Sequence, residues 1–279
     1  QVKPGYLFAA FAGVKQDGNE FIGDALKKGA AAILTGEGGN AREKAVFLRA
    51  GNPRRSFAKM AANFFGTQVK TTVAVTGTNG KSSTVSFCRQ IWQSLGYAAA
   101  SLGTLGITAP GINRAGALTT PDPVALHADI AELVSNGVTH LAMEASSQGL
   151  DQYRLDGVAL KAAAFTNLTR DHLDYHGTME NYLAAKLRLF TEVMPKGTFV
   201  VLNREMDVFD AVKSACAKQG LHVIEYGRGA HDICLTAQKP LAHGQLVEFT
   251  LFGRKHSAEI PLVGDFQAGN ALCALGLVV

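Results

Sequence analysis

The sequence predicts an α/β protein in two parts, a small N-terminal α/β unit over residues 1–67 and a larger unit over residues 68–279. Short apolar segments rich in β-formers alternate with helix-length amphipathic segments, which is typical of a mostly parallel sheet with helices on both faces. The stretch Gly66-Thr67-Gln68 separates two such series. Three consecutive strand-like segments near the end predict an antiparallel β meander.

In the first part, the apolar runs predict strands at 6–10, 31–34 and 46–48 and helices at 20–28 and 53–65. Asn52 and Pro53 mark the start of the second helix, because Asn is a favoured N-cap and Pro is tolerated in the first turn. In the second part, we expect strands at 72–75, 139–143, 163–166, 198–202 and 222–225, and helices at 81–95, 123–135, 179–190 and 208–218. The expected meander covers 232–237, 245–252 and 256–260, and a last helix begins at 267.

The composition excludes several classes of protein. With 47% hydrophobic and 18% charged residues in 279, the chain is neither disordered nor collagen-like. No apolar stretch approaches the roughly 18 residues of a membrane span, so we expect no membrane insertion. The net charge of +4, without a long basic run, argues against a nucleic-acid partner. Four widely spaced cysteines predict neither a disulfide framework nor structural zinc and favour a reducing cytoplasm.

The run TGTNGKSS at 76–83 lies between a predicted strand and a predicted helix. Such a loop points backbone N–H groups and the positive end of a helix at phosphates. Lys81 would offer a positive charge to the phosphates and Ser82 a hydroxyl to Mg²⁺. The strict P-loop pattern requires Gly where this chain has Val75, so the loop is a variant, and the alternative is a glycine turn with an exposed Lys. We therefore predict a P-loop ATPase-like central unit.

Two acidic or histidine-bearing segments follow predicted strands. Glu144 ends the 139–143 strand, at the sheet edge where α/β proteins bind ligands, and a carboxylate there could hold Mg²⁺. Taken alone, it is an ordinary charged residue at a strand end. The run DHLDYHG at 171–177 favours metal ligation or acid–base chemistry, or else is a solvated polar loop.

Lys186 is unusual because it lies on the apolar stripe of the 179–190 helix, four residues from both Tyr182 and Phe190. A lysine in such a place usually extends its amine to water. Alternatively, burial lowers its pKa and leaves a neutral amine that reacts with CO₂ to form a carbamate, an anionic metal ligand. The spacing does not choose between these interpretations. Hydroxyl-rich loops at 119–121 and 146–149, with Gln152 and Arg154, could hold a polar anionic substrate or could be ordinary turns.

Together these segments resemble the Mur ligases of bacterial peptidoglycan synthesis, and within that family the branch that makes UDP-N-acetylmuramoyl-tripeptide. The matching segments are TGTNGKS at 76–82, Thr119-Thr120, MEASSQGL at 143–150, NLTRDHLDYHG at 167–177, AAK at 184–186 and GDFQAGNAL at 264–272. The phosphate loop is shared with folylpolyglutamate and cyanophycin synthetases, whereas the DHLDYHG run looks specific to this branch. The opening VKPGYLF at 2–8 also looks like the N-terminal domain of that branch.

The resemblance implies an N-terminal UDP-substrate-binding domain with a truncated start, a central ATP-binding domain, and a C-terminal ligase domain that this chain lacks. It implies an ATP-dependent ligase that joins a diamino acid, diaminopimelate in preference to lysine, to UDP-MurNAc-L-Ala-D-Glu through an acyl phosphate. This chain alone is then expected not to ligate, and we expect a monomer in the bacterial cytoplasm. The alternatives are another Mur-like amino-acid ligase, of the cyanophycin or folylpolyglutamate synthetase type, and a nucleotide-binding module without ligase activity.

The resemblance also assigns roles to residues of this chain. Lys81, Glu144, His172 and Lys186 are expected to be catalytic. Mg²⁺ is expected on Ser82 and Glu144, and a second Mg²⁺ on Glu144, His172 and carbamylated Lys186. ATP is expected to contact Gly77, Thr78, Asn79, Gly80, Lys81, Ser82, Ser83 and, near the adenine, Asn270. The UDP substrate is expected to contact Val14, Lys15, Gln16, Thr119, Thr120, Ser146, Gln152 and Arg154.

Overall fold

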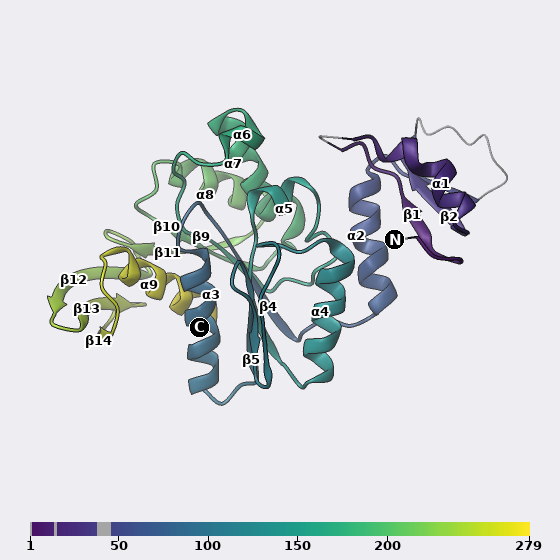
Figure 1. Ribbon diagram of the computed structural model, residues 1–279. Helices are drawn as coiled ribbons and strands as arrows, with labels where there is room; N and C mark the ends of the chain where they lie inside the picture. The colour runs from purple at the N-terminus through teal and green to yellow at the C-terminus, as the bar shows by residue number, and fades with distance from the viewer. Residues whose placement is uncertain (1, 14–15, 38–45) are drawn as a thin grey trace.

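A computed structural model describes residues 2–13, 16–37 and 46–279 (Figure 1). The N-terminal unit holds a parallel sheet in the order β1 (Leu7–Ala9), β2 (Ala32–Thr35) and β3 (Val46–Arg49). A 3₁₀ turn over Gly18–Phe21 and the short helix α1 (Ile22–Lys27) connect β1 to β2. Its core is small and centres on Ala10, Ala25 and Ile33. The strands and helix predicted for this segment are confirmed.

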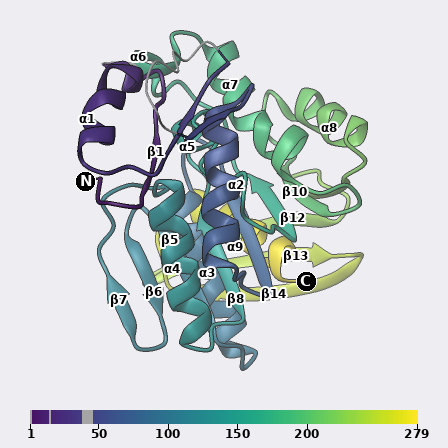
Figure 2. The same ribbon diagram turned by 90° about the vertical axis from the view of Figure 1, so that its right-hand side faces the viewer.

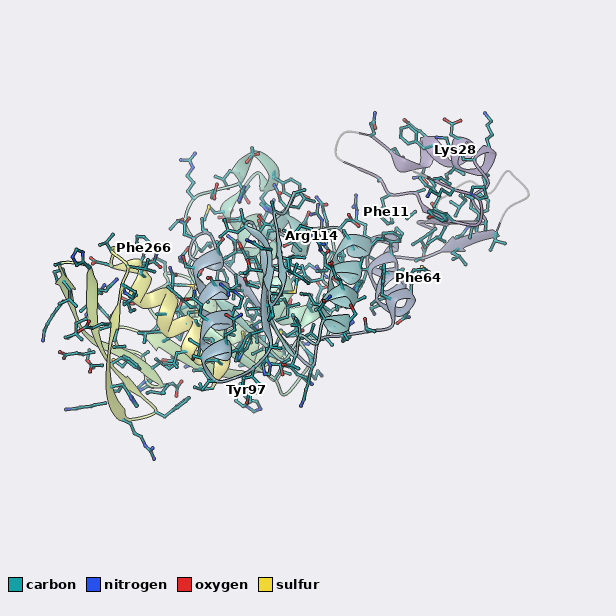
Figure 3. The ribbon with its side chains drawn as sticks, turned by 60° about the horizontal axis from the view of Figure 1, so that its bottom comes forward. Phe11, Lys28, Phe64, Tyr97, Arg114 and Phe266 are labelled. Carbon is teal, nitrogen blue, oxygen red and sulfur yellow. The ribbon has the colours of Figure 1, made fainter. Side chains whose placement is uncertain are left out.

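Helix α2 (Pro53–Phe65) connects this unit to the larger one. It begins as predicted, because the Asn52 side chain accepts a hydrogen bond from the backbone N–H of Arg55 at 2.9 Å. It ends at Gly66, whose φ of 65° suits glycine. Figures 1 and 2 show α2 beside α4 (Pro123–Ser135), a helix of the larger unit. Phe64, labelled in Figure 3, lies near the C-terminal end of α2 and is 84% exposed. Thus α2 packs against both parts of the chain.

The larger unit is built on an 11-stranded sheet whose central strands are all parallel. From one side to the other these central strands are β12 (Ile233–Leu241), β11 (His222–Gly227), β10 (Phe199–Asn203), β9 (Ala162–Phe165), β4 (Thr71–Thr76), β8 (His140–Glu144) and β5 (Ala99–Gly103). The order departs from the chain order at β4, which lies between β8 and β9. That crossover is the kind of position where open α/β sheets bind ligands.

Antiparallel strands extend both edges of this sheet. The predicted meander is confirmed as β12, β13 (Gly244–Leu251) and β14 (Arg254–Ile260), with the addition that β12 first pairs parallel with β11. At the opposite edge, β6 (Gly106–Ala109) and β7 (Ile112–Arg114) continue from β5 as hairpins. The sequence analysis did not predict β5, β6 or β7, because their small residues and glycines carry a weak strand pattern.

Helices cover both faces of the sheet, as predicted (Figure 1). On one face, α3 (Lys81–Ser94) and α9 (Phe266–Val278) pack against each other and bury Trp92 and Leu272. On the other face lie α4, α7 (Met179–Arg188) with a π-helical turn over Leu189–Val193, and α8 (Phe209–Lys218). None of the helices in the described part of the chain is long and apolar enough to cross a membrane.

The carboxyl ends of β4, β8 and β9 meet at one edge of the sheet because the three strands are parallel neighbours. Three connections therefore come together there: the 77–80 loop, the short helix α5 (Ser147–Asp151) after β8, and the segment after β9 that contains α6 (Leu173–His176). The candidate residues Gly77, Thr78, Asn79, Gly80, Ser146, Gln152 and His172 lie on these connections, and Glu144 ends β8 beside them.

Candidate active site

The loop between β4 and α3 is shaped to receive phosphate oxygens. Gly77 and Gly80 have φ values of 142° and 87°, and a side chain at either would meet Thr166 Oγ1 or Asn270 Oδ1, respectively. Asn167 fixes the loop, because its side chain accepts the backbone N–H of Asn79 at 2.9 Å. Helix α3 starts at Gly80 without a side-chain cap, so its first N–H groups are available to an anion. The loop therefore has a shape that fits a phosphate, and phosphate binding at these residues stays a prediction.

The amine of Lys81 lies over this loop. Its Nζ donates to the carbonyl oxygens of Gly77 at 2.9 Å and Thr78 at 2.8 Å. Burial lowers the pKa of Lys81, while the carboxylates of Glu144 and Asp171 act in the opposite direction. Lys81 is thus partly buried over the loop and is not an exposed side chain on a glycine turn; its contact with a phosphate stays a prediction.

Glu144 ends β8 with only 1% of its surface exposed, and hydroxyl and amide donors surround its carboxylate. Its Oε1 accepts from Ser82 Oγ at 2.8 Å and from the backbone N–H of Thr104 at 2.9 Å, and its Oε2 accepts from Thr104 Oγ1 at 3.2 Å. A carboxylate next to a serine hydroxyl, at the start of the helix after a phosphate loop, is a donor set of the kind that Mg²⁺ prefers. The structure therefore brings Ser82 and Glu144 together as predicted.

Lys186 is buried, with 1% exposed, so its amine does not extend to water. Its Nζ donates to the carbonyl oxygen of Gly77 at 2.8 Å and lies 4.3 Å from the centre of the Tyr182 ring. Burial is the main reason that its pKa is lowered to about 6; the positive charge of Lys81 adds to this effect and Asp171 opposes it. At neutral pH the amine is therefore mostly uncharged, which is the state that reacts with CO₂.

His172 occupies a different environment from the other metal-binding candidates. Its side chain is about half exposed, and the residue begins α6 with a φ of 51°. Its ring centre lies 6.1 Å from that of Tyr182, but among the described residues no hydrogen bond joins it to Glu144 or Lys186. Nor do the described residues contain a group of three or more His, Cys, Asp and Glu side chains placed to hold a metal ion. The predicted set for a second Mg²⁺ stays a prediction.

Four of the candidate substrate residues, Thr120, Ser146, Gln152 and Arg154, are linked by hydrogen bonds beside the backbone carbonyl of Glu144. Thr120 Oγ1 donates to the Glu144 carbonyl oxygen at 2.9 Å and accepts from the backbone N–H of Ser146 at 3.0 Å. Arg154 donates to the Thr120 carbonyl oxygen at 2.6 Å and to Gln152 Oε1 at 2.7 Å. The structure thus brings Thr120 together with Ser146, Gln152 and Arg154, which the sequence analysis grouped as one possible substrate site.

Tyr175, from the DHLDYHG run, belongs to the same set. Its hydroxyl accepts from Gln152 Nε2 at 3.0 Å and donates to Asp151 Oδ2 at 2.8 Å. Burial raises the pKa of Tyr175, so it stays a protonated donor at neutral pH. The sequence analysis treated this run only as a histidine and aspartate cluster and did not single out its tyrosine.

Two predicted ligand contacts lie at the margins of the site. Asn270 is buried on α9 beside Gly80, and its Nδ2 donates to Gln267 Oε1 at 3.2 Å. It lines a pocket next to the phosphate loop with, among others, Asn167, Asn203, Tyr226 and Phe266. In the N-terminal unit, Gln16 is exposed and its carbonyl oxygen accepts from Gly13 N at 3.0 Å. Val14 and Lys15 lie outside the described residues.

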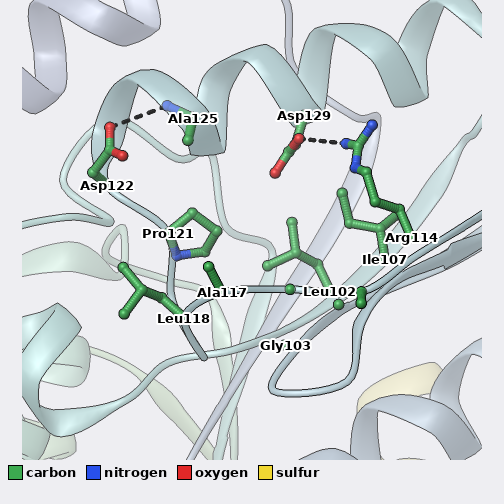
Figure 4. A pocket seen from close by; sticks show the side chains of 13 residues that line it. Leu102, Gly103, Ile107, Arg114, Ala117, Leu118, Pro121, Asp122, Ala125 and Asp129 are labelled. Atoms are coloured by element: carbon green, nitrogen blue, oxygen red, sulfur yellow. Dashed lines mark hydrogen bonds and ion pairs between the residues drawn. The ribbon is translucent and has the colours of Figure 1, made fainter. Parts of the chain in front are cut away.

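A second pocket opens between the β5–β6 hairpin, the 115–122 loop and the start of α4 (Figure 4). Its floor is apolar, with Leu102 and Ile107, and Arg114 pairs with Asp129 at 2.6 Å on its rim. None of its lining residues was a predicted site residue. The glycines at 103 and 106, which indicate a tight turn after a strand, are the signal that could have pointed to this region.

Comparisons with known proteins point to one family. A family model described as the Mur ligase middle domain matches residues 75–278. A UDP-N-acetylmuramoyl-L-alanyl-D-glutamate–2,6-diaminopimelate ligase from Rhizobium meliloti is 50% identical over 279 residues, which are 100% of this chain and 57% of that protein. The solved structure of a ligase with the same name aligns with a TM-score of 0.86 at 27% identity, covering 99% of this chain and 57% of the other.

The fold alone is also shared with the MurF ligase from Thermotoga maritima in complex with ADP, at a TM-score of 0.64 and 19% identity, covering 99% of this chain and 60% of that one. The family model covers well over half of the chain. The chain therefore belongs to the Mur ligase family. It spans 57% of the length of the Rhizobium meliloti relative.

Proposed function

We propose that the chain is the nucleotide- and UDP-substrate-binding part of an ATP-dependent ligase that adds diaminopimelate to UDP-MurNAc-L-Ala-D-Glu. The observation that carries this proposal is the position of Glu144. Its carboxylate contacts Ser82 of the phosphate loop, while its backbone carbonyl contacts Thr120 of the substrate set. A nucleotide and an anionic acceptor bound on these two sides would lie next to each other. The name of the 50% identical relative supports the substrate assignment.

The chain's own residues account for phosphoryl transfer in the following way. The backbone N–H groups at the start of α3 would hold the ATP phosphates, and Lys81 would exchange its two loop carbonyl oxygens for phosphate oxygens. Ser82 and Glu144 would hold Mg²⁺, which neutralises charge on the phosphates. The substrate carboxylate then attacks the γ-phosphorus and ADP leaves, giving an acyl phosphate. The amine of the amino acid displaces phosphate from that intermediate to form the amide, and positioning does most of the work.

Lys186 is proposed to act as a carbamate. Its amine attacks the carbon of CO₂ and loses a proton to solvent, which gives an anion in place of a neutral amine. The low pKa of Lys186, about 6, favours this reaction because the amine must be unprotonated. The carbamate would lie beside Lys81, because the nitrogen atoms of both lysines contact the Gly77 carbonyl oxygen. It would serve as a ligand for a second Mg²⁺ together with Glu144 and His172.

The hydrogen-bonded set around Arg154 is proposed to hold the peptide end of the UDP substrate. Arg154 donates hydrogen bonds to the Thr120 carbonyl oxygen and to Gln152 Oε1, and these two bonds fix its guanidinium in one orientation. Its remaining N–H groups can bind a carboxylate. Gln16, with Val14 and Lys15, is proposed to meet the uridine end.

The test is ligation by the gene product that contains this chain, with ATP, Mg²⁺ and UDP-MurNAc-L-Ala-D-Glu. We expect product with diaminopimelate and little with lysine. Product with glutamate on a folate acceptor, or with the amino acids of cyanophycin, would instead favour the other amino-acid ligases. Binding of ATP without acyl phosphate on any acceptor would favour a module that only binds nucleotide. A monomer in the bacterial cytoplasm stays a prediction of the same proposal.

A further inference from the structure

Thr104 lies between the two halves of the candidate site. It is the first residue of the tight turn that joins β5 to β6. Its backbone N–H and its hydroxyl both donate to the Glu144 carboxylate, at 2.9 and 3.2 Å. The same hydroxyl oxygen lies 2.9 Å from Thr119 Oγ1. One residue thus contacts both the candidate Mg²⁺ ligand and a candidate substrate residue.

The direction of these hydrogen bonds follows from the chemistry of the groups. An ionised carboxylate only accepts, so the single hydroxyl proton of Thr104 goes to Glu144. The contact between the two threonines then requires Thr119 to donate and Thr104 to accept. The hydroxyl proton of Thr119 is therefore used in its hydrogen bond to Thr104. Toward a ligand, Thr119 presents only its lone pairs, and the group that it binds must carry an N–H or O–H.

The local backbone keeps this arrangement in register. Strand β5 pairs parallel with β8, so that Leu102 lies opposite Met143 and Gly103 comes beside Glu144. A side chain at Gly103 would collide with the Glu144 carboxylate, so glycine is required there for the carboxylate to reach Thr104. Gly103 and Leu118, the chain neighbours of Thr104 and Thr119, both line the pocket in Figure 4. The two threonines therefore lie where the hairpin meets the 115–122 loop.

We propose that Thr104 is a positioning residue that holds the Glu144 carboxylate for Mg²⁺ and makes Thr119 an acceptor for an N–H or O–H group of the UDP-linked substrate. This inference rests on the proposed function. Thr104 itself is exposed, so water replaces its hydroxyl contacts at small cost to the fold. Its effect is therefore expected in ligand binding and not in stability.

The experiment compares Thr104→Val, which keeps the shape and the backbone N–H but loses the hydroxyl, with Thr104→Ser, which keeps the hydroxyl. Thr108→Val is the control, since Thr108 lies on β6 and, within the described part of the chain, its side chain makes no hydrogen bond. Calorimetry of the protein containing this chain measures two affinities. One is the Mg²⁺ concentration that half-saturates binding of an ATP analogue, and the other is the affinity for UDP-MurNAc-L-Ala-D-Glu in EDTA.

For Thr104→Val we expect each affinity to fall about tenfold. The Mg²⁺-dependent affinity falls because Glu144 loses a hydrogen bond, and the substrate affinity falls because Thr119 loses its partner. Thr104→Ser and Thr108→Val should stay within about twofold of the wild type, and all variants should unfold at the same temperature. Unchanged affinities in Thr104→Val, loss of only one of the two, or equal losses in Thr104→Ser would overturn the inference. A wild-type protein that binds neither ligand would overturn the proposed function, and the inference with it.

Discussion

Lys81 and Lys186 donate to the same acceptor, the carbonyl oxygen of Gly77, at 2.9 and 2.8 Å. Two ammonium groups at one oxygen repel each other, so the pair is stable only when one amine gives up its proton. The more buried Lys186 does so, because burial and then the charge of Lys81 lower its pKa to about 6. Near neutral pH Lys186 is therefore mostly uncharged, while Lys81 is the cation that we propose for phosphate.

The first prediction concerns the pH dependence of stability. In the unfolded chain Lys186 has its ordinary pKa of 10.5, and in the folded chain about 6, so the unfolded state binds more protons between these values. Stability should therefore fall as the pH falls through that window and level off below it. In bicarbonate-free buffer, Lys186→Met should be more stable than the wild type at about pH 6.5, on the order of 5 kcal/mol, and the two should become nearly equal as the pH approaches and passes 10.5.

Urea unfolding at the two pH values measures this difference. Lys218→Met, which removes an exposed lysine of α8, is the charge-matched control and should change little at either pH. A Lys186→Met protein that is no more stable than the wild type at the lower pH would show that burying the Lys186 amine does not lower the free energy of unfolding.

The second prediction concerns the carbamate. Lys186→Ala should abolish ligation by the gene product, and added short carboxylic acids should partly restore it, because they can place an anion where the carbamate would be. Labelled bicarbonate should give a carbamate carbonyl signal by NMR in the wild type that is missing in the variant. Full activity of Lys186→Ala without an added acid would contradict the carbamate hypothesis.

The third prediction concerns a buried ion pair below the site. Asp156 is 1% exposed in its side chain, and Arg188 of α7 donates to both of its oxygens at 2.8 Å, while Arg55 of α2 reaches it at 3.0 Å. Because Arg188 is nearly buried and Arg55 is about 38% exposed, the first contact should matter more. Arg188→Met should cost about 3 kcal/mol of unfolding free energy and Arg55→Met about 1 kcal/mol. Denaturant unfolding of both variants measures this, and equal costs would contradict the assignment.

The fourth prediction concerns the phosphate loop. Gly80→Ala places a methyl group against Asn270 Oδ1 at a φ of 87°, which L residues rarely adopt. We expect at least about a tenfold loss of nucleotide affinity, with a stability cost of only about 1–2 kcal/mol. Gly36→Ala is the control, because its added methyl group meets nothing within 4 Å. Combining Gly80→Ala with Asn270→Ala removes the collision but not the backbone strain. Nucleotide affinity in Gly80→Ala equal to that of the wild type would mean that phosphates do not bind at this loop.

Local sequence signals located the phosphate loop, placed Glu144 at a strand end and placed Lys186 on an apolar helix face. They left open whether the Lys186 amine is buried or extends to water, and the structure shows that it is buried. Each signal depends on a short-range pattern: glycines between a strand and a helix, a carboxylate after an apolar run, and a lysine spaced with Tyr182 on one helix face. Helix α2 was equally clear, because its cap residues stand next to it in the chain.

The features that the sequence did not reveal depend on contacts between distant segments. Thr104 meets Glu144 only because β5 and β8 are paired, and Arg188 and Arg55 meet Asp156 from separate helices. The backbone at His172, with a φ of 51°, likewise has no signature in residue type. These contacts and this backbone conformation can be identified only in the folded structure.

The most direct test of the central claim is calorimetric binding of two ligands to the protein, a non-hydrolysable ATP analogue with Mg²⁺ and UDP-MurNAc-L-Ala-D-Glu. The account predicts that both bind, that Ser82→Ala weakens the Mg²⁺-dependent binding of the nucleotide, and that Arg154→Met weakens the binding of the UDP substrate. Nucleotide binding without any affinity for UDP-MurNAc-L-Ala-D-Glu would contradict the ligase assignment.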